Sequence, residues 1–515
     1  MREKTQTKKK RVLVVGAGAA GMACTDQLSM HPDRFDVTLI EAQNYCGGQA
    51  FSIPIDKERY GAGWLNQGVQ GVDLQVSFGK GDKFWTNLFP TELLQKHSNE
   101  IKRFKWVIRF MRWFEVFFAI IPIKISLKMF FFSDEFINYM IYPALALFLG
   151  TGNATPDLPS IMMERLYTSP TYGMWYPIDE KSLSSNLPPM VVFPEESAFY
   201  ERWRQMLVSR GVHVRLSTEV DTIVERSSKG VKLLTRPRRA QPDRHNPTTQ
   251  DDDATTEQGV DHDLPTTLEE YDEIVLCVLA DTAQRLLGKT ARWVDRQVLG
   301  STKWSDDITV THNDTEYMEK WYTCHFDEKN AVSSIGGRDD SDRVQKGKDD
   351  FNPMYYIKQV PADKRKLEMC FDCSNFQYQL KESRKPFKDH IFQTIFLNKK
   401  HEDTWTRHEI KKDKIIREDW WHQLCHSWTH YVKVVPWMWL LNGKKHTTFA
   451  AAWTLVNAHE LAVISGMAAA YRLGAEYPKD LEEDPFAMLC FRLYLLLSHA
   501  TIYKKGKHQS QPDSQ

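Results

Sequence analysis

The feature that most restricts the fold is a glycine-rich turn close to the N-terminus. A largely apolar run at residues 11–15 is typical of a strand buried in a parallel sheet. Gly16, Gly18 and Gly21 follow it in the pattern G-x-G-x-x-G, and residues 22–30 continue as a predicted helix. The first glycine permits a tight turn, the second lets the backbone approach a pyrophosphate, and the third lets helix and strand pack closely. The N-terminus of the helix would offer free N–H groups to the phosphates.

An acidic residue stands where a dinucleotide-binding unit needs one. Residues 35–40 form the second predicted strand, and Glu41 follows it, twenty residues after Gly21. A carboxylate at this point can accept hydrogen bonds from ribose hydroxyls. Strand, turn, helix, strand and acid together predict dinucleotide binding. The expected contacts within this unit are Gly16, Gly18, Ala19, Ala20, Gly21, Glu41 and Ala42.

The overall composition narrows the class of partner. The 67 basic and 67 acidic residues cancel, which argues against nucleic acid as the main partner. A chain of 515 residues, 42% of them hydrophobic, can form two or three domains. Eight cysteines in so long a chain do not form a disulfide framework, and the N-terminus has no signal-peptide pattern. We therefore expect a cytoplasmic protein, with its oligomeric state left open.

Further motifs indicate which dinucleotide is bound. Residues 46–49 contain a glycine pair, residues 60–65 a second glycine-rich stretch, residues 216–223 a strand pattern, and residues 447–478 a strand followed by a helix. These segments resemble the flavin-containing amine oxidase superfamily, which includes protoporphyrinogen oxidases and phytoene (carotenoid) desaturases. The pattern is most similar to fungal FAD-dependent amine oxidoreductases, some of them from secondary metabolism. The resemblance implies FAD as the cofactor and assigns contacts to Gly48, Gln49, Gly61, Ala62, Val220, Trp453, Asn457 and Ala462.

The C-terminal segment is similar to the part of that superfamily which closes the flavin site. A helix beginning near Asn457 would direct its positive dipole end at the electron-rich edge of the flavin ring. Two positions depart from the family pattern. Gln49 stands where Arg or Lys is usual, and Trp453 lies where a Gly-Asp or Gly-Glu pair is common. The stretch at 71–78 is also shorter than in the family.

The same segment predicts how FAD is attached. Covalent attachment in this superfamily uses a Cys or His beside the ring, and residues 443–478 contain no cysteine. His459 lies on the expected helix, which leaves His446 as the only alternative attachment point. We expect non-covalent FAD.

The expected fold class is α/β: a Rossmann-like FAD-binding domain interleaved with a mixed α+β substrate-binding domain. Residues 236–267 are rich in Pro, Asp, Thr and Gln, which predicts a disordered surface insert, and residues 271–278 predict one buried strand after it. The expected FAD-binding segments are 11–75, 190–300 and 440–478, the substrate segments are 76–189 and 301–439, and residues 479–515 form an apolar helix and a polar tail.

Two strongly apolar segments raise the question of membrane contact. Charged residues interrupt residues 104–149, so no stretch reaches the roughly 18 apolar residues of a spanning helix, and buried helices around a cavity are expected. Residues 486–503 predict a terminal helix. Packing against the protein is favoured for this helix, while peripheral membrane contact and a true span stay as alternatives.

The catalytic residues are not identified by any local motif. His422, His426 and His430 would share one face of a helix, where an aromatic wall of the substrate cavity is favoured over a metal site. Trp421, Trp428 and Tyr431 would belong to that wall. Lys303 and His312 are further candidates near the flavin. Cys370 and Cys373 form a lone C-x-x-C, for which buried core cysteines are expected.

These observations predict an oxidoreductase that transfers a hydride from a small, largely apolar organic substrate to FAD. The substrate would be an amine, or a C–C or C–O unit that is desaturated. Two alternatives stay open: a redox-neutral flavin-dependent double-bond isomerase, and a catalytically weak FAD-binding partner protein.

Overall fold

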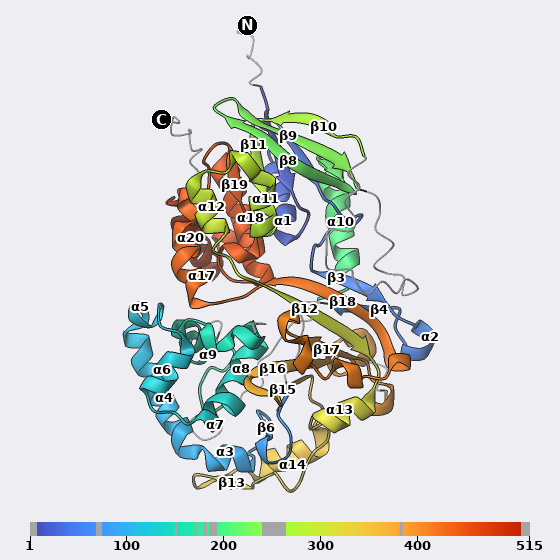
Figure 1. The fold of residues 1–515 in the computed structure, drawn as a ribbon, viewed down its shortest axis with the longest axis vertical. Helices are drawn as coiled ribbons and strands as arrows, with labels where there is room; N and C mark the ends of the chain where they lie inside the picture. The colour runs from blue at the N-terminus through green and yellow to red at the C-terminus, as the bar shows by residue number, and fades with distance from the viewer. Residues whose placement is uncertain are drawn as a thin grey trace.

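A five-stranded parallel sheet forms the upper part of the molecule (Figure 1). The computed structural model describes residues 8–67, 75–149, 152–170, 173–179, 183–184, 193–238, 264–381 and 385–505. In the sheet, strands β19, β11, β1, β2 and β7 lie side by side in that order, and each pair is parallel. Their bounds are β1 Lys10–Val15, β2 Phe35–Ile40, β7 His213–Arg215, β11 Glu273–Leu276 and β19 Thr447–Phe449.

Alternate residues of β1 face two different layers, which explains its continuous apolar sequence. Val12 and Val14 pack with helices α1 (Ala19–Ser29), α10 (Glu196–Ser209) and α18 (His459–Leu473). Leu13 and Val15 pack on the opposite side, against a three-stranded sheet (β8–β10) and helix α11 (Ala280–Leu287). A parallel sheet covered on both faces is the arrangement in which such a strand is buried throughout.

The three-stranded sheet revises the bounds of one predicted strand and of the predicted insert. Its strands are β8 (Thr218–Ser227), β9 (Gly230–Pro237) and β10 (Thr267–Tyr271). The buried strand expected at 271–278 is present as β11, but its predicted bounds are too wide. β10 ends at Tyr271, and Asp272 separates it from β11, with the Asp272 carboxylate accepting from the Arg11 N–H at 2.7 Å. The predicted insert 236–267 begins and ends inside β9 and β10, and its residues 239–263 lie outside the described part of the chain.

A seven-stranded mixed sheet forms the lower part of the molecule. Its order is β18, β12, β17, β16, β15, β5 and β6. Strands of both sheets alternate along the chain, so the expected interleaving of a Rossmann-like domain with an α+β domain is confirmed. The bounds are β5 Val76–Phe78, β6 Trp85–Thr86, β12 Trp304–His312, β15 Tyr355–Val360, β16 Asp363–Asp372, β17 Phe392–Phe396 and β18 Ile415–Leu424.

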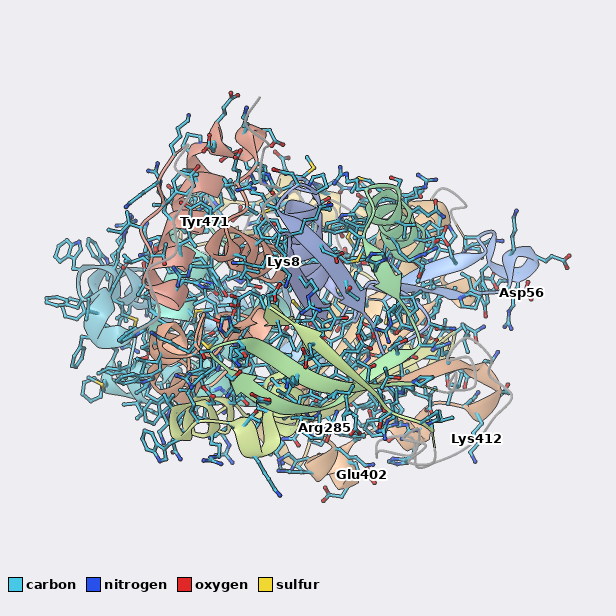
Figure 2. The ribbon with its side chains drawn as sticks, turned by 90° about the horizontal axis from the view of Figure 1, so that it is seen from above. Lys8, Asp56, Arg285, Glu402, Lys412 and Tyr471 are labelled. Carbon is cyan, nitrogen blue, oxygen red and sulfur yellow. The ribbon has the colours of Figure 1, made fainter. Side chains whose placement is uncertain are left out.

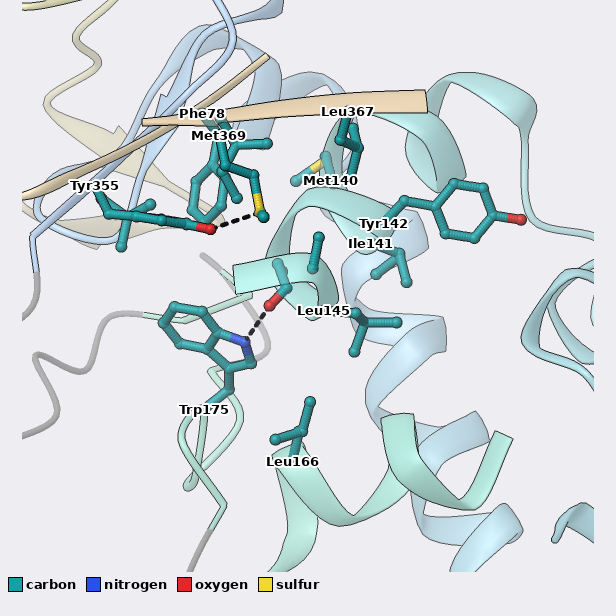
Figure 3. Packing of buried hydrophobic residues seen from close by; sticks show 14 of the residues in the cluster. Phe78, Met140, Ile141, Tyr142, Leu145, Leu166, Trp175, Tyr355, Leu367 and Met369 are labelled. Carbon is teal, nitrogen blue, oxygen red and sulfur yellow. Dashed lines mark hydrogen bonds between the residues drawn. The ribbon is translucent and has the colours of Figure 1, made fainter. Parts of the chain in front are cut away.

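Helices cover one face of this lower sheet, and a large apolar core lies between them. Figure 3 shows side chains of α8 (Tyr142–Leu149) beneath Leu367 and Met369 of β16. The Trp175 indole N–H donates to the Ala144 carbonyl at 3.1 Å, so its polar atom is satisfied inside the core. Helices α4 (Ser98–Trp113), α5 (Glu115–Phe118), α6 (Ile123–Met129) and α9 (Ser160–Thr168) continue this layer.

Of the two apolar helical segments, one differs from its sequence-based expectation and one agrees with it. The expectation of buried helices within residues 104–149 is only half right, because α4–α6 bury one face and expose large aromatic side chains on the other. Helix α20 (Pro485–His499) packs against α18, as favoured for a packed terminal helix. Within the described ranges, we find no helix with both the length and the apolar character that crossing a membrane requires.

Candidate functional site

The glycine turn has the geometry that its sequence predicts. Gly16 has a φ of 100°, and a Cβ on it would lie 2.6 Å from the Cys277 carbonyl oxygen. A Cβ on Gly21 would lie 1.8 Å from the Gly16 carbonyl oxygen. Both contacts are impossible for a real side chain, so the turn and its contact with β11 require glycine at these two positions.

Gly18 differs from its two neighbours because it borders open space. It precedes α1 as its N-cap, with no side chain capping the first turn. A Cβ on Gly18 would meet only the Gly48 Cα, at 3.9 Å, and an isolated bridge joins Gly18 to Gly47. The Gly47 N–H donates to the Ala17 carbonyl at 2.9 Å. The uncapped helix N-terminus therefore faces a gap that two glycine backbones border, which suits a phosphate.

Glu41 supports the turn directly. Its carboxylate accepts the Ala17 N–H at 2.7 Å and the Gln43 N–H at 2.8 Å. Burial raises the pKa of this carboxyl above its ordinary value, although the backbone N–H groups oppose the shift. The Glu41 carbonyl accepts from Thr218 N–H, which places the start of β8, and buried Val220 on it, next to this corner.

A second helix N-terminus lies at the same edge of the sheet. Helix α18 begins at His459, two residues after the predicted start, and its N-cap Ala458 makes no capping hydrogen bond through a side chain. The helix follows β19 as α1 follows β1, so both N-termini stand at the carboxyl edge of the parallel strands. Ligands of open α/β sheets bind at that edge. Trp453 is buried here and donates from its indole N–H to the Val278 carbonyl at 2.9 Å.

Close contact fixes the two helices relative to each other. A Cβ on Gly466 of α18 would lie 2.1 Å from the Ala20 carbonyl oxygen in α1. Ala462, one turn before Gly466, belongs to the apolar cluster that includes Ala20.

Three predicted residues meet at the start of α18. The Asn457 N–H donates to His426 Nε2 at 3.1 Å, so the ring proton of His426 is on Nδ1, and Nδ1 donates to Tyr431 Oη at 3.0 Å. Burial lowers the pKa of His426 to about 3, which keeps the imidazole neutral in this arrangement. The structure thus brings His426, Tyr431 and Asn457 together.

The predicted helix carrying three histidines is wrong. His422 lies on β18, which pairs with β12, whereas His430 lies on helix α17 (Trp428–Lys433). His426 lies in the connection between them, so the three rings do not share a helix face. Trp421 stacks on Phe51 with ring centroids 5.5 Å apart.

His422 has a role that its spacing did not indicate. Its Nδ1 lies 2.6 Å from Asp306, and its Nε2 lies 3.0 Å from Asp281 in α11. The hydrogen bonds to Asp281 and then Asp306 raise the pKa of His422 to about 9. Its carbonyl accepts from the Gln49 side chain at 3.3 Å. His422 therefore links the Rossmann-like part to the lower sheet as a charged group.

The other residues proposed as catalytic candidates have different surroundings. Lys303 is exposed, and its carbonyl accepts from Cys425 N–H. His312 is buried, with Nε2 bonded to Thr394 and Nδ1 accepting from Asp314 N–H, and burial lowers its pKa to about 3. Trp428 is half-buried at the start of α17.

Gly61 and Ala62 are not brought to the glycine turn. They lie in the connection between β3 (Phe51–Pro54) and β4 (Trp64–Gln67), beside helix α2 (Lys57–Tyr60). Figure 2 shows this hairpin, with Asp56 labelled, at the opposite edge of the view from the terminal helices. The end of β4 is closer to the centre of the molecule than the hairpin tip is (Figure 1).

Residues at the end of β4 form a polar network that sequence reasoning missed. The Gln67 side chain donates to Asp419 on β18 at 2.8 Å, and Arg417 pairs with the same carboxylate. The Asn66 side chain accepts from the Glu196 N–H at 3.2 Å. Gln67 and Asp419, like Asn66 and Glu196, are more than a hundred residues apart in the chain, so no local pattern could identify these contacts.

The remaining candidates are the possible covalent attachment point for FAD and the possible metal ligands. His446 precedes β19 and contacts Glu273 at the start of β11, so it lies at the amino edge of the sheet, opposite the glycine turn. Cys370 and Cys373 are buried free cysteines, as expected. Among the residues described, no group of three or more His, Cys, Asp or Glu side chains is placed to hold a metal ion.

Comparisons with known proteins agree with this architecture. Residues 14–72 match the family model of the NAD(P)-binding Rossmann-like domain. No curated protein sequence matches the chain. Three solved structures with similar folds are a protein assigned as a protoporphyrinogen oxidase from Exiguobacterium sp. 255-15 (TM-score 0.53, 11% identity, 90% of this chain and 99% of that chain covered), putrescine oxidase bound to putrescine (0.53, 12%, 90% and 99%), and a CLA-producing fatty acid isomerase from P. acnes (0.50, 13%, 90% and 98%).

The chain is thus an α/β protein with a Rossmann-like nucleotide-binding domain. Its fold is similar to those of putrescine oxidase and of the protein assigned as a protoporphyrinogen oxidase, so the resemblance read from the sequence is confirmed at the level of the fold. The closer affinity to fungal proteins stays a prediction.

Proposed function

We propose that the protein is an FAD-dependent oxidoreductase acting on a small, largely apolar organic molecule. The observation that carries the proposal is the position of two uncapped helix N-termini, those of α1 and α18, at the carboxyl edge of one parallel sheet. Two positive helix ends suit a ligand with negative charge at two separated points, as a flavin dinucleotide has in its pyrophosphate and its ring edge.

The residues present fit FAD. Gly18 and Gly48 leave a gap in front of α1, and Glu41 stands at the corner where a ribose would lie. Bound FAD would supply a hydride acceptor for an amine, or for a C–C or C–O bond to be desaturated. In this proposal the neutral His426 orients Asn457 and Tyr431 at the ring edge as a positioning residue. Trp421 and Phe51 would form part of an apolar wall for the substrate.

Replacement of Gly18 tests cofactor binding. Gly18→Val places a side chain in the gap. Its Cβ would lie no closer than 3.9 Å to any protein atom beyond its chain neighbours, so the variant should fold but lose FAD. Gly63→Val is the matched control, because a Cβ there meets nothing within 4 Å in the hairpin. The measurements are the visible flavin spectrum and the FAD released per protein. A full flavin content in Gly18→Val would contradict the proposal.

The reaction is tested separately from cofactor binding. We expect anaerobic incubation with amines and apolar alcohols to bleach the flavin absorption, with oxygen restoring it. The isomerase alternative is supported by the fold likeness to the fatty acid isomerase. It predicts a shifted double bond with no net oxygen uptake. Bound FAD that no substrate pool reduces would favour the non-catalytic partner protein.

A further inference from the structure

Helices α4–α6 present an unusual surface to solvent. Ten large hydrophobic side chains between residues 106 and 131 are exposed, with Trp113 at 82%, Val116 at 88% and Phe131 at 85%. Soluble proteins rarely gather so many exposed apolar side chains in one place, and such patches mark contacts with proteins or membranes. The ten are Trp106, Phe110, Trp113, Phe114, Val116, Phe117, Ile120, Ile125, Met129 and Phe131.

Helix α4 shows how the surface arises. Ile101, Phe104, Val107, Ile108 and Met111 form its buried face and are part of the large core. On the opposite face, exposed aromatic residues alternate with cations. Its exposed aromatic and basic members are Lys102, Arg103, Trp106, Arg109, Phe110, Arg112 and Trp113.

Charge on this segment is strongly one-sided. Residues 102–128 contain seven Lys or Arg and one acidic residue, whereas the whole chain has no net charge. The acidic residue, Glu115, is paired with Arg165 at 2.5 Å. Lys124 and Lys128 pair with Asp157 and Asp134, so part of the surplus is balanced from outside the segment.

A second apolar surface lies on the same side of the molecule. Phe486, Leu489, Leu493 and Leu496 are exposed along one face of α20. Two exposed tryptophans are in the 3₁₀-helix η9 (Val435–Leu440), which packs against α20. Figure 1 places α4–α6 and α20 along one side, and in Figure 2 side chains of these segments project from that side.

We infer that α4–α6 dock the protein onto a negatively charged lipid bilayer, with α20 and η9 as a second contact. Trp and Phe partition to the interface of a bilayer, and basic residues beside them attract anionic headgroups. A second copy of this chain fits less well, because a two-fold contact would bring two positive surfaces together. The inference does not depend on the cofactor.

Vesicle binding tests the inference. We expect the full-length protein to sediment with vesicles of phosphatidylcholine and phosphatidylserine, more weakly with phosphatidylcholine alone, and less as salt increases. The triple variant Trp113→Ser, Val116→Ser, Phe117→Ser should bind at least roughly tenfold more weakly. Lys102→Ala and Arg109→Ala should each weaken binding about fivefold.

Controls separate the surface from a general loss of hydrophobicity. The triple variant Val208→Ser, Val224→Ser, Leu268→Ser removes side chains that are 47%, 51% and 57% exposed on α10, β8 and β10. It should bind vesicles as the unaltered protein does. Replacing Leu489, Leu493 and Leu496 by Ser tests the second contact, with a smaller expected loss. Circular dichroism and thermal unfolding check that every variant is folded.

Two results would overturn the inference. One is sedimentation that is absent, or equal for the unaltered protein and the Trp113 triple variant. The other is a stable dimer in light scattering that the same triple variant dissociates, together with no vesicle binding, since the surface would then be a protein interface.

Discussion

The Cα of Gly466 faces the carbonyl oxygen of Ala20 so closely that a Cβ would lie 2.1 Å from that oxygen. This contact sets the distance between α18 and α1, and therefore between the two helix N-termini of the proposed FAD site. A Gly466→Ala variant must separate the helices, and we expect a loss of roughly 1–3 kcal/mol in the free energy of unfolding.

Urea unfolding and FAD titration measure both effects of Gly466→Ala. Alanine is favoured over glycine inside a helix by about 1 kcal/mol, so a loosely packed site would instead become more stable. That gain would contradict the packing argument. Gly63→Ala is the control, with no atom within 4 Å of its Cβ and an expected change within about 0.5 kcal/mol.

Glu41 should matter for both folding and cofactor affinity. Glu41→Gln replaces one carboxylate oxygen by an NH₂ group, which cannot accept from the Ala17 or Gln43 N–H. We expect a loss of about 1–3 kcal/mol in stability and weaker FAD binding. Fluorescence titration with FAD and urea unfolding provide the measurements. Glu92→Gln, at an exposed position, should change neither the stability nor the FAD affinity. If the two variants behave alike, Glu41 has no role in the FAD site.

His422 should make stability depend on pH in the alkaline range. Hydrogen bonds to Asp281 and Asp306 raise its pKa to about 9, against about 6.5 in an unfolded chain. The folded state therefore holds the proton of His422 more tightly than the unfolded chain does. The stabilisation that protonated His422 gives the folded state is complete below pH 6.5 and is lost as the pH rises through 9. Thermal unfolding from about pH 6 to 10 should show a steeper fall for the unaltered protein than for His422→Gln. Parallel curves would show that the link contributes nothing.

FAD should be released by acid. The alternative attachment point, His446, is at the amino edge of the sheet beside Glu273, and His459 Nε2 is bonded to Tyr200 Oη at 2.6 Å. Neither ring is directed at the proposed flavin position. Acid precipitation should leave FAD in the supernatant, and His446→Ala should retain the same flavin content. Because Gln49 supplies no positive charge, partial loss of FAD on dilution is expected, and a yellow pellet would contradict the prediction.

Sequence reasoning succeeded where local pattern and packing agree. Strand β2 has the predicted bounds, and α18 begins two residues after its predicted start. Each belongs to a β-α unit whose glycines have fixed steric roles, as at Gly16 and Gly466. The domain boundaries and the FAD contacts stay predictions.

The failures have physical causes. Histidines four residues apart predicted a helix, but His422 is held in β18 by pairing with β12, which is more than a hundred residues earlier. The exposed face of α4 carries Trp106, Phe110 and Trp113 among its basic residues, so the high aromatic content of the segment suggested more burial than the helix has. The polar link between Gln67 and Asp419 depends on the register of two distant strands.

The order of strands in the Rossmann-like sheet has a consequence for biosynthesis. Strand β1 begins at Lys10, and its neighbour β11 pairs on its other side with β19, which begins only at Thr447. Helix α1 likewise gains its partner α18 only when residues 459–473 have been made. Such long-range pairing is slow and exposes unpaired apolar strands meanwhile. We therefore expect a nascent chain on the ribosome to be unable to retain FAD until nearly all of it has emerged, so that cofactor capture is among the last steps of its folding.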